Sequence, residues 1–100
     1  MSNLTLNIPH SQTQEEALNR IKQLFSRLQE EQKGTVTNVQ EIWNGPNGEF
    51  SFSAKGFNIA GTIQVKPNEV QLDSDLPFAV SLFKGQIASM ITQRANDLLA

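Results

Sequence analysis

The residue types that most often carry chemistry are sparse in this sequence. It contains no cysteine and a single histidine, His10, which directly follows Pro9. Without thiolates or a second imidazole the chain lacks the usual ligands of zinc, so we predict neither a metal nor another cofactor. A lone histidine between two elements is typical of a surface or capping residue, and a ligand contact is the alternative.

The acidic residues do not form an evident catalytic pair. The glutamates at 15–16 and at 30–31 are adjacent in sequence near helix ends, so the two side chains of each pair diverge. Asp73 and Asp75 share one face of a predicted strand, but paired catalytic acids also need a pocket. No serine has an evident base and no glycine-rich phosphate loop is present. We therefore predict a non-catalytic protein.

Two further side chains could mark a binding surface. Trp43 is the sole tryptophan; packing in the core or at a sheet edge is the simpler interpretation, and a contact surface is the alternative. Lys84 interrupts an apolar helical pattern beside Phe83. Its stem could cover the core with the ammonium in water, or it could mark an anion or ligand site. The candidate contact residues are therefore Trp43, Phe83, Lys84 and His10.

The elements that must position these residues centre on three predicted strands. Apolar and polar residues alternate at 50–54, 57–65 and 70–76, the period of a sheet with one apolar and one polar face. Turn residues separate the three runs, which favours an antiparallel meander. The predicted polar face carries Ser51, Ser53, Thr62, Gln64, Gln71 and Asp73.

Two more strands are predicted outside the meander's centre. Residues 3–8 alternate cleanly and end at Pro9, and we expect this strand beside the last one of the sheet. Residues 35–43 are rich in β-branched types but do not alternate, which a bulge near Asn38 would reconcile. Because this edge could pair with a second chain, both a monomer and a homodimer are expected states.

Two predicted helices flank the meander. Apolar residues recur at helical spacing from 13 to 32, where Ser11 or Thr13 could open a capping box. The same spacing returns from 77 to 99, but Gly85 weakens a helix interior. Either this helix is broken or kinked around 83–85, or the backbone packs closely there. The predicted fold is α+β, an antiparallel five-stranded sheet (β-α-β-β-β-β-α) with both helices packed on one face.

Length and charge restrict the class of protein further. One hundred residues predict a single domain over 1–100. The net charge is -2 and the phenylalanines fall on the predicted buried face, so we expect no nucleic-acid partner. No apolar run reaches the ~20 residues of a transmembrane segment, and the N-terminal residues do not resemble a signal peptide. We expect the protein in the cytoplasm.

Several stretches in a fixed order resemble the polyhydroxyalkanoic acid system family of small bacterial proteins. They are Ile8-Pro9-His10-Ser11 before a helix, the 56–65 strand, Leu76-Pro77 leading to Phe83-Lys84-Gly85-Gln86-Ile87, and the closing Leu98-Leu99. The sequence departs from the family in a longer 35–48 segment and a high Asn and Gln content. The resemblance implies an association with hydrophobic storage granules or their proteins, and implies no reaction.

Three functional hypotheses follow. The first is a non-catalytic accessory or binding protein of polyester granules or their proteins, acting at the granule surface. The second is a small carrier that holds a hydrophobic ligand in a cavity between the sheet and the helices. The third is an enzyme that would depend on His10 and Lys84.

Overall fold

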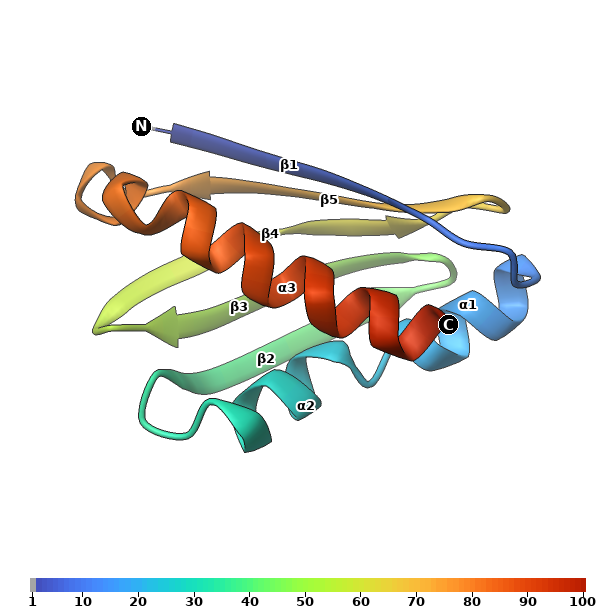
Figure 1. Ribbon diagram of the computed structural model, residues 1–100, viewed down its shortest axis with the longest axis horizontal. Helices are drawn as coiled ribbons and strands as arrows, with labels where there is room; N and C mark the ends of the chain where they lie inside the picture. The colour runs from blue at the N-terminus through green and yellow to red at the C-terminus, as the bar shows by residue number, and fades with distance from the viewer. Residues whose placement is uncertain (1) are drawn as a thin grey trace.

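The computed structural model describes residues 2–100 and shows one antiparallel sheet with the helices over one of its faces (Figure 1). The five strands lie in the order β1-β5-β4-β3-β2, so the first strand pairs with the last and the other four form a meander, as predicted. The elements are β1 Ser2–Pro9, α1 Gln14–Ile21, α2 Leu24–Glu31, β2 Val36–Asn44, β3 Asn47–Ala54, β4 Phe57–Val65, β5 Glu69–Leu76, the 3₁₀ helix η1 Phe78–Phe83 and α3 Lys84–Leu99. The α+β prediction is confirmed.

The helices cover the apolar face of the sheet because alternate residues of every strand point there. In β5, Val70, Leu72 and Leu76 are buried, and the residues between them are at least partly exposed except Ser74. The six residues predicted for the polar face are all at least partly exposed. Helix α3 crosses this layer diagonally from η1 to the far end of the sheet (Figure 1).

Three phenylalanines join the helix layer to the centre of the sheet. Phe25 of α2 stacks on Phe50 of β3 with 4.5 Å between the ring centroids, and lies 5.8 Å from the ring of Phe52. Each aromatic pair contributes about 0.5–1.5 kcal/mol beyond the area it buries. All three side chains are at most 4 % exposed.

The single helix predicted from 13 to 32 is wrong in one respect, because the chain forms two helices there. The amide of Gln23 bonds to the carbonyl of Arg20, which tightens the backbone to a turn at Lys22-Gln23. Ile21 of α1 and Leu24 of α2, on either side of this turn, are both buried in the core. The start of α1 agrees with the predicted cap, since the hydroxyl of Thr13 accepts the N–H of Glu16 at 3.1 Å.

Two predicted irregularities are confirmed. The register of β2 against β3 shifts between Thr37 and Gln40, and Asn38 has a positive φ of 54°, so the bulge lies where it was expected. The last helical segment is broken at Phe83, where η1 ends and α3 begins. The alternative of close backbone packing at Gly85 is wrong, because a Cβ added there would meet nothing within 4 Å.

Gly61 of β4 leaves the space that the core phenylalanines need. A Cβ at this position would lie 2.8 Å from Cζ of Phe50 and would overlap the main-chain oxygen of Asp73. The neighbouring Ser74 is the one buried polar side chain of residues 3–100, and its hydroxyl donates to the carbonyl of Ala60 at 2.6 Å. A small residue at 61 therefore allows both the ring of Phe50 and the close pairing of β4 with β5.

We predict that Gly61→Ala lowers the free energy of unfolding by about 3 kcal/mol, because the added methyl group overpacks the sheet. Gly85→Ala is the matched control with the opposite sign, since it adds a methyl group in open space and favours the helix by about 0.4–1 kcal/mol. Urea unfolding of both variants measures this. Equal stability of Gly61→Ala and the wild type would contradict the packing described.

Candidate functional site

The structure does not gather the four sequence-predicted contact residues into one site. His10 lies at the end of the sheet where β4 turns into β5, because its backbone N–H bonds to the carbonyl of Asn68. Trp43 lies in the edge strand β2, and Phe83 and Lys84 lie where η1 meets α3. The β4–β5 turn and η1 are at opposite ends of the molecule's long axis (Figure 1).

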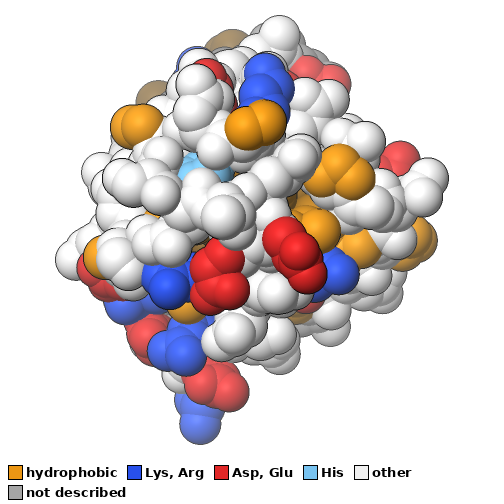
Figure 2. Space-filling view, turned by 90° about the vertical axis from the view of Figure 1, so that its right-hand side faces the viewer, with side chains coloured by type: hydrophobic (Ala, Val, Ile, Leu, Met, Phe, Trp, Pro, Cys, Tyr) orange, Lys and Arg blue, Asp and Glu red, His pale blue; other side chains and the backbone are white. Residues whose placement is uncertain are grey.

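Both ring nitrogens of His10 are occupied by structural hydrogen bonds. The N–H of Gln12 donates to Nδ1 at 3.1 Å, so the ring proton is on Nε2, which lies 2.9 Å from the carbonyl oxygen of Lys66. Figure 2 looks at this end of the molecule and shows the imidazole partly covered by backbone atoms and side chains that are neither hydrophobic nor charged. These contacts join the β1–α1 connection to the β4–β5 turn and leave neither nitrogen free for a ligand.

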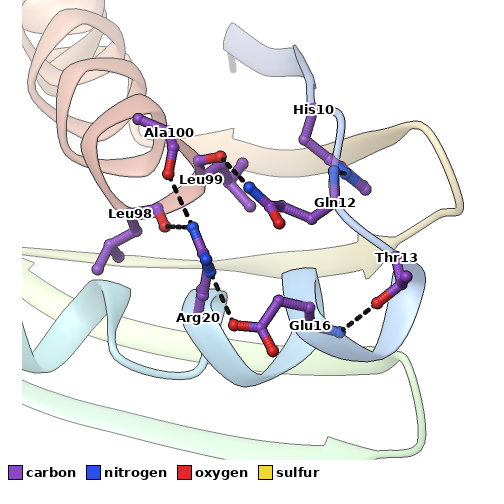
Figure 3. Close-up of polar contacts among 8 residues, drawn as sticks. All are labelled: His10, Gln12, Thr13, Glu16, Arg20, Leu98, Leu99 and Ala100. Carbon is purple, nitrogen blue, oxygen red and sulfur yellow. Dashed lines mark hydrogen bonds and ion pairs between the residues drawn. The ribbon is translucent and has the colours of Figure 1, made fainter.

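Near His10, hydrogen bonds of Arg20 hold α1 against the last turn of α3 (Figure 3). Arg20 donates to the main-chain oxygens of Leu98 at 3.3 Å and Ala100 at 2.8 Å, and Glu16 holds the guanidinium at 2.9 Å. The cation therefore satisfies carbonyl groups at the negative end of the α3 dipole. These contacts stabilise the packing of α1 against the end of α3.

Trp43 packs across the sheet onto a glycine. Its ring atom Cε3 lies 2.8 Å from where a Cβ of Gly48 would be, so the indole covers the bare backbone of the neighbouring strand. The indole N–H donates to Oε1 of Glu41 at 3.2 Å, and the ammonium of Lys22 is 6.0 Å from the ring. The structure thus gives Trp43 a packing role at the sheet edge.

The residue beside it, Glu41, is a partly buried carboxylate. Burial raises the pKa of the Glu41 carboxyl above its ordinary value of 4.5, and the hydrogen bond from Trp43 offsets only part of this effect. Ionised Glu41 therefore costs folding free energy at neutral pH.

A more distinctive surface lies around η1. Phe78 is 81 % exposed and Leu82 is 87 % exposed, although both are large apolar side chains. They project from the outer side of a two-turn 3₁₀ helix whose inner side is anchored by the buried Val80. We call Phe78, Ala79, Leu82 and Phe83 the η1 patch. A cluster of this kind, held in place by a buried neighbour, is typical of an interaction surface.

Sequence reasoning named Phe83 and Lys84 but missed Phe78 and Leu82. The signal was present, because the helical arc from 77 to 99 includes Val80 and Phe83 while Phe78 and Leu82 fall outside it. A large apolar residue outside the buried arc must either break the helix or stay exposed. Here both happen.

A narrow crevice opens beside the patch, between Phe83 and the β3–β4 turn. Its apolar walls are formed by Ala54, Phe57, Val80, Phe83, Ile87 and Met90. The hollow has a volume of about 20 Å³. Since about one water molecule fits this volume, the crevice itself cannot enclose a hydrophobic ligand.

Two further findings concern metal ions and membrane-spanning helices. Within residues 2–100, no three His, Cys, Asp or Glu side chains are grouped so that they could hold a metal ion. In the same range, no helix has the length and apolar character needed to span a membrane.

Comparison with known proteins places the chain in a family. The family model described as "Putative polyhydroxyalkanoic acid system protein" matches residues 4–99. The chain belongs to this family. The match runs from within β1 to the end of α3, so the resemblance noted from the sequence is confirmed.

Other comparisons add little to the polyhydroxyalkanoic acid system assignment. No curated protein matches the chain. Among solved structures, the crystal structure of TTHA0849 from Thermus thermophilus aligns over 98 % of this chain and 92 % of that chain. The sequence identity is 10 % and the TM-score is 0.37, a likeness too weak to indicate a shared fold or activity.

We predict that His10→Ala lowers the free energy of unfolding by about 1–2 kcal/mol, because two hydrogen bonds are lost in a partly buried position. His10→Asn is the matched variant, since its side-chain oxygen can still accept the N–H of Gln12 and should recover part of the loss. Thermal and urea unfolding measure both. An alanine variant as stable as the wild type would contradict a structural role.

We also predict that Glu41→Gln stabilises the protein at pH 7. The folded-state pKa of Glu41 is raised, so the penalty is absent below about pH 4.5 and develops as pH rises through the folded-state value. The gain in melting temperature should therefore be present at pH 7 and vanish near pH 4. Glu49→Gln, on the exposed face of β3, controls for the change in net charge. A gain of equal size at both pH values would contradict burial as its cause.

Proposed function

We propose that this protein is a non-catalytic accessory protein that binds the surface of polyhydroxyalkanoate granules through the η1 patch. The family name supplies the context of granules. The observation that carries the proposal is the exposure of Phe78 and Leu82 on one short helix. A water-insoluble polyester offers the apolar surface on which such side chains lose contact with water.

Several features of the molecule support attachment at this place. The patch lies at one end of the long axis (Figure 1), so it can touch a surface without disturbing the sheet. The hydrogen bonds of Arg20 to the end of α3 lie at the other end of the molecule. Val80 beneath the patch is buried and fixes the helix before contact, which reduces the ordering cost of binding. Lys55 and Lys84 beside Phe83 can extend their stems over an apolar surface while their ammonium groups stay in water.

Two neighbouring apolar side chains that leave water contribute enough binding free energy for a clear test. Fully burying one large apolar side chain is worth about 1.5–3 kcal/mol. We therefore predict that Phe78→Ser combined with Leu82→Ser weakens binding to polyester granules at least about tenfold. Co-sedimentation of the purified protein with washed granules, across a range of granule concentrations, measures the change.

The matched control is Ile42→Ser. Ile42 is 70 % exposed but lies in β2 on the uncovered face of the sheet, away from η1. This variant should sediment like the wild type, and urea unfolding should show that all variants remain folded. The proposal fails if the patch variant sediments like the wild type, or if Ile42→Ser loses binding to the same extent.

A further inference from the structure

The two edges of the sheet differ in how they are protected against pairing with a further strand. β2 carries the bulge at Asn38 and the carboxylate of Glu41. Natural sheets use such bulges and charges to keep edge strands apart. β1 has neither, because its pairing with β5 is continuous over Ser2–Pro9 and none of these residues is charged. β1 is also the outermost element on its side of the molecule (Figure 1), so it is the unprotected edge.

The strand pairing shows which backbone groups of β1 are free. His10, directly after the strand, donates its N–H to the carbonyl of Asn68 at 3.0 Å, which continues the register of β1 on β5. Residues of an antiparallel strand bond alternately to its two sides, so the even-numbered residues of β1 bond to β5 and the odd-numbered ones direct their backbone groups outward. The outward N–H groups are those of Asn3, Thr5 and Asn7. Within residues 2–100, no other strand or loop bonds to them.

Two antiparallel copies of β1 are complementary in one register. When Thr5 lies opposite the same residue of the second copy, Asn3 lies opposite Asn7, so outward backbone groups face outward backbone groups. Each such pair can form two hydrogen bonds. On the helix side of the sheet, Leu4 then lies opposite Leu6, which is only partly buried in the single chain. The register joins polar to polar and apolar to apolar residues, whereas a shift of one residue would mix the two faces.

We propose that β1 pairs antiparallel with β1 of a second copy of this chain, which joins two five-stranded sheets into one about a two-fold axis at Thr5. A second copy is the partner that fits, because the edge is complementary to itself in backbone groups and in both faces. No like charges meet across it. A single edge strand makes a small interface, so we expect a dimer with a Kd of about 10–100 μM. This inference does not rest on the proposed function.

Amide hydrogen exchange followed by NMR tests the pairing residue by residue. The amides of Leu4 and Leu6 bond to β5 and should be protected at every protein concentration. Those of Thr5 and Asn7 should exchange about fivefold more slowly at about 1 mM protein than at about 20 μM, because the dimer forms in this range. Sedimentation velocity should show the same monomer–dimer equilibrium. Exchange of both outward amides that does not change with concentration, or a monomer at about 1 mM, would overturn the proposal.

A substitution on the two-fold axis separates dimerisation from folding. Thr5→Pro removes an outward N–H and leaves the bonds of β1 to β5 in place, since an edge strand accepts proline where the N–H faces solvent. It should weaken dimerisation at least about tenfold. Thr5→Val is the matched control, because it also removes the hydroxyl that donates to Asp73 at 2.9 Å but keeps the N–H. It should dimerise like the wild type. Wild-type affinity in a folded Thr5→Pro variant would refute the pairing.

Charge substitutions test the register and do not depend on proline. Asn3→Lys combined with Asn7→Lys places like charges opposite each other at both ends of the paired strands. Asn3→Lys combined with Asn7→Glu places opposite charges there, and should dimerise about tenfold more tightly than the first combination. Urea unfolding checks that both variants are folded. Equal affinity of the two variants would exclude this register and overturn the proposal.

The η1 patch offers an alternative contact between copies, which the same assays exclude or establish. Antiparallel pairing of β1 directs the two η1 patches toward opposite ends of the dimer (Figure 1). Phe78→Ser combined with Leu82→Ser should therefore lose granule binding and keep the dimer, and Thr5→Pro should show the reverse. A dimer that disappears in the patch variant and persists in Thr5→Pro would assign the contact to η1 and overturn this proposal. If the wild type dimerises through β1 but does not sediment with granules, the proposed function alone fails.

Discussion

The stacking of Phe25 on Phe50 is the contact on which the other features of this fold depend. It attaches the helix layer to the middle of the meander, where the sheet offers its largest apolar side chains. Gly61 has no side chain because the ring of Phe50 occupies that space. Helices α1 and α2 are separated by a turn, and each contributes its own buried side chain to this layer, Ile21 from α1 and Phe25 from α2.

The two ends of the molecule differ in how their side chains are packed. At one end the polar groups of His10, Arg20 and Gln12 are paired with main-chain oxygens of distant segments, which fixes the first helix and the end of α3. At the other end, the chain between β5 and α3 is too short to extend the core, and only Val80 of η1 enters it. The apolar residues around Val80 are therefore left outside.

Much of the fold was predictable from the sequence because four of the five strands alternate and the turns between strands are marked by Gly, Pro or Asn. The bulge at Asn38 and the break at Phe83 were also predictable, since local pattern and local structure agree there. The break at Lys22-Gln23 was not predictable, because neither glycine nor proline marks it and the helical spacing of apolar residues continues through it. Phe78 and Leu82 of the η1 patch were missed although they fall outside the buried helical arc, because the sequence does not show that the chain there forms a separate 3₁₀ helix with both side chains exposed. The approach of Lys55 to Phe83 was not predictable, because it depends on the β3–β4 turn.

The position of η1 at one end of the long axis has a consequence for crowding on a particle. The molecule measures 37 × 26 × 23 Å. A protein attached by this end stands upright, occupies the smallest area that its shape permits, and forms a coat about as thick as its longest dimension. Both sheet edges and the polar sheet face then point sideways, toward neighbouring molecules in the coat. Lateral order among attached molecules would therefore be decided by surfaces that do not touch the particle.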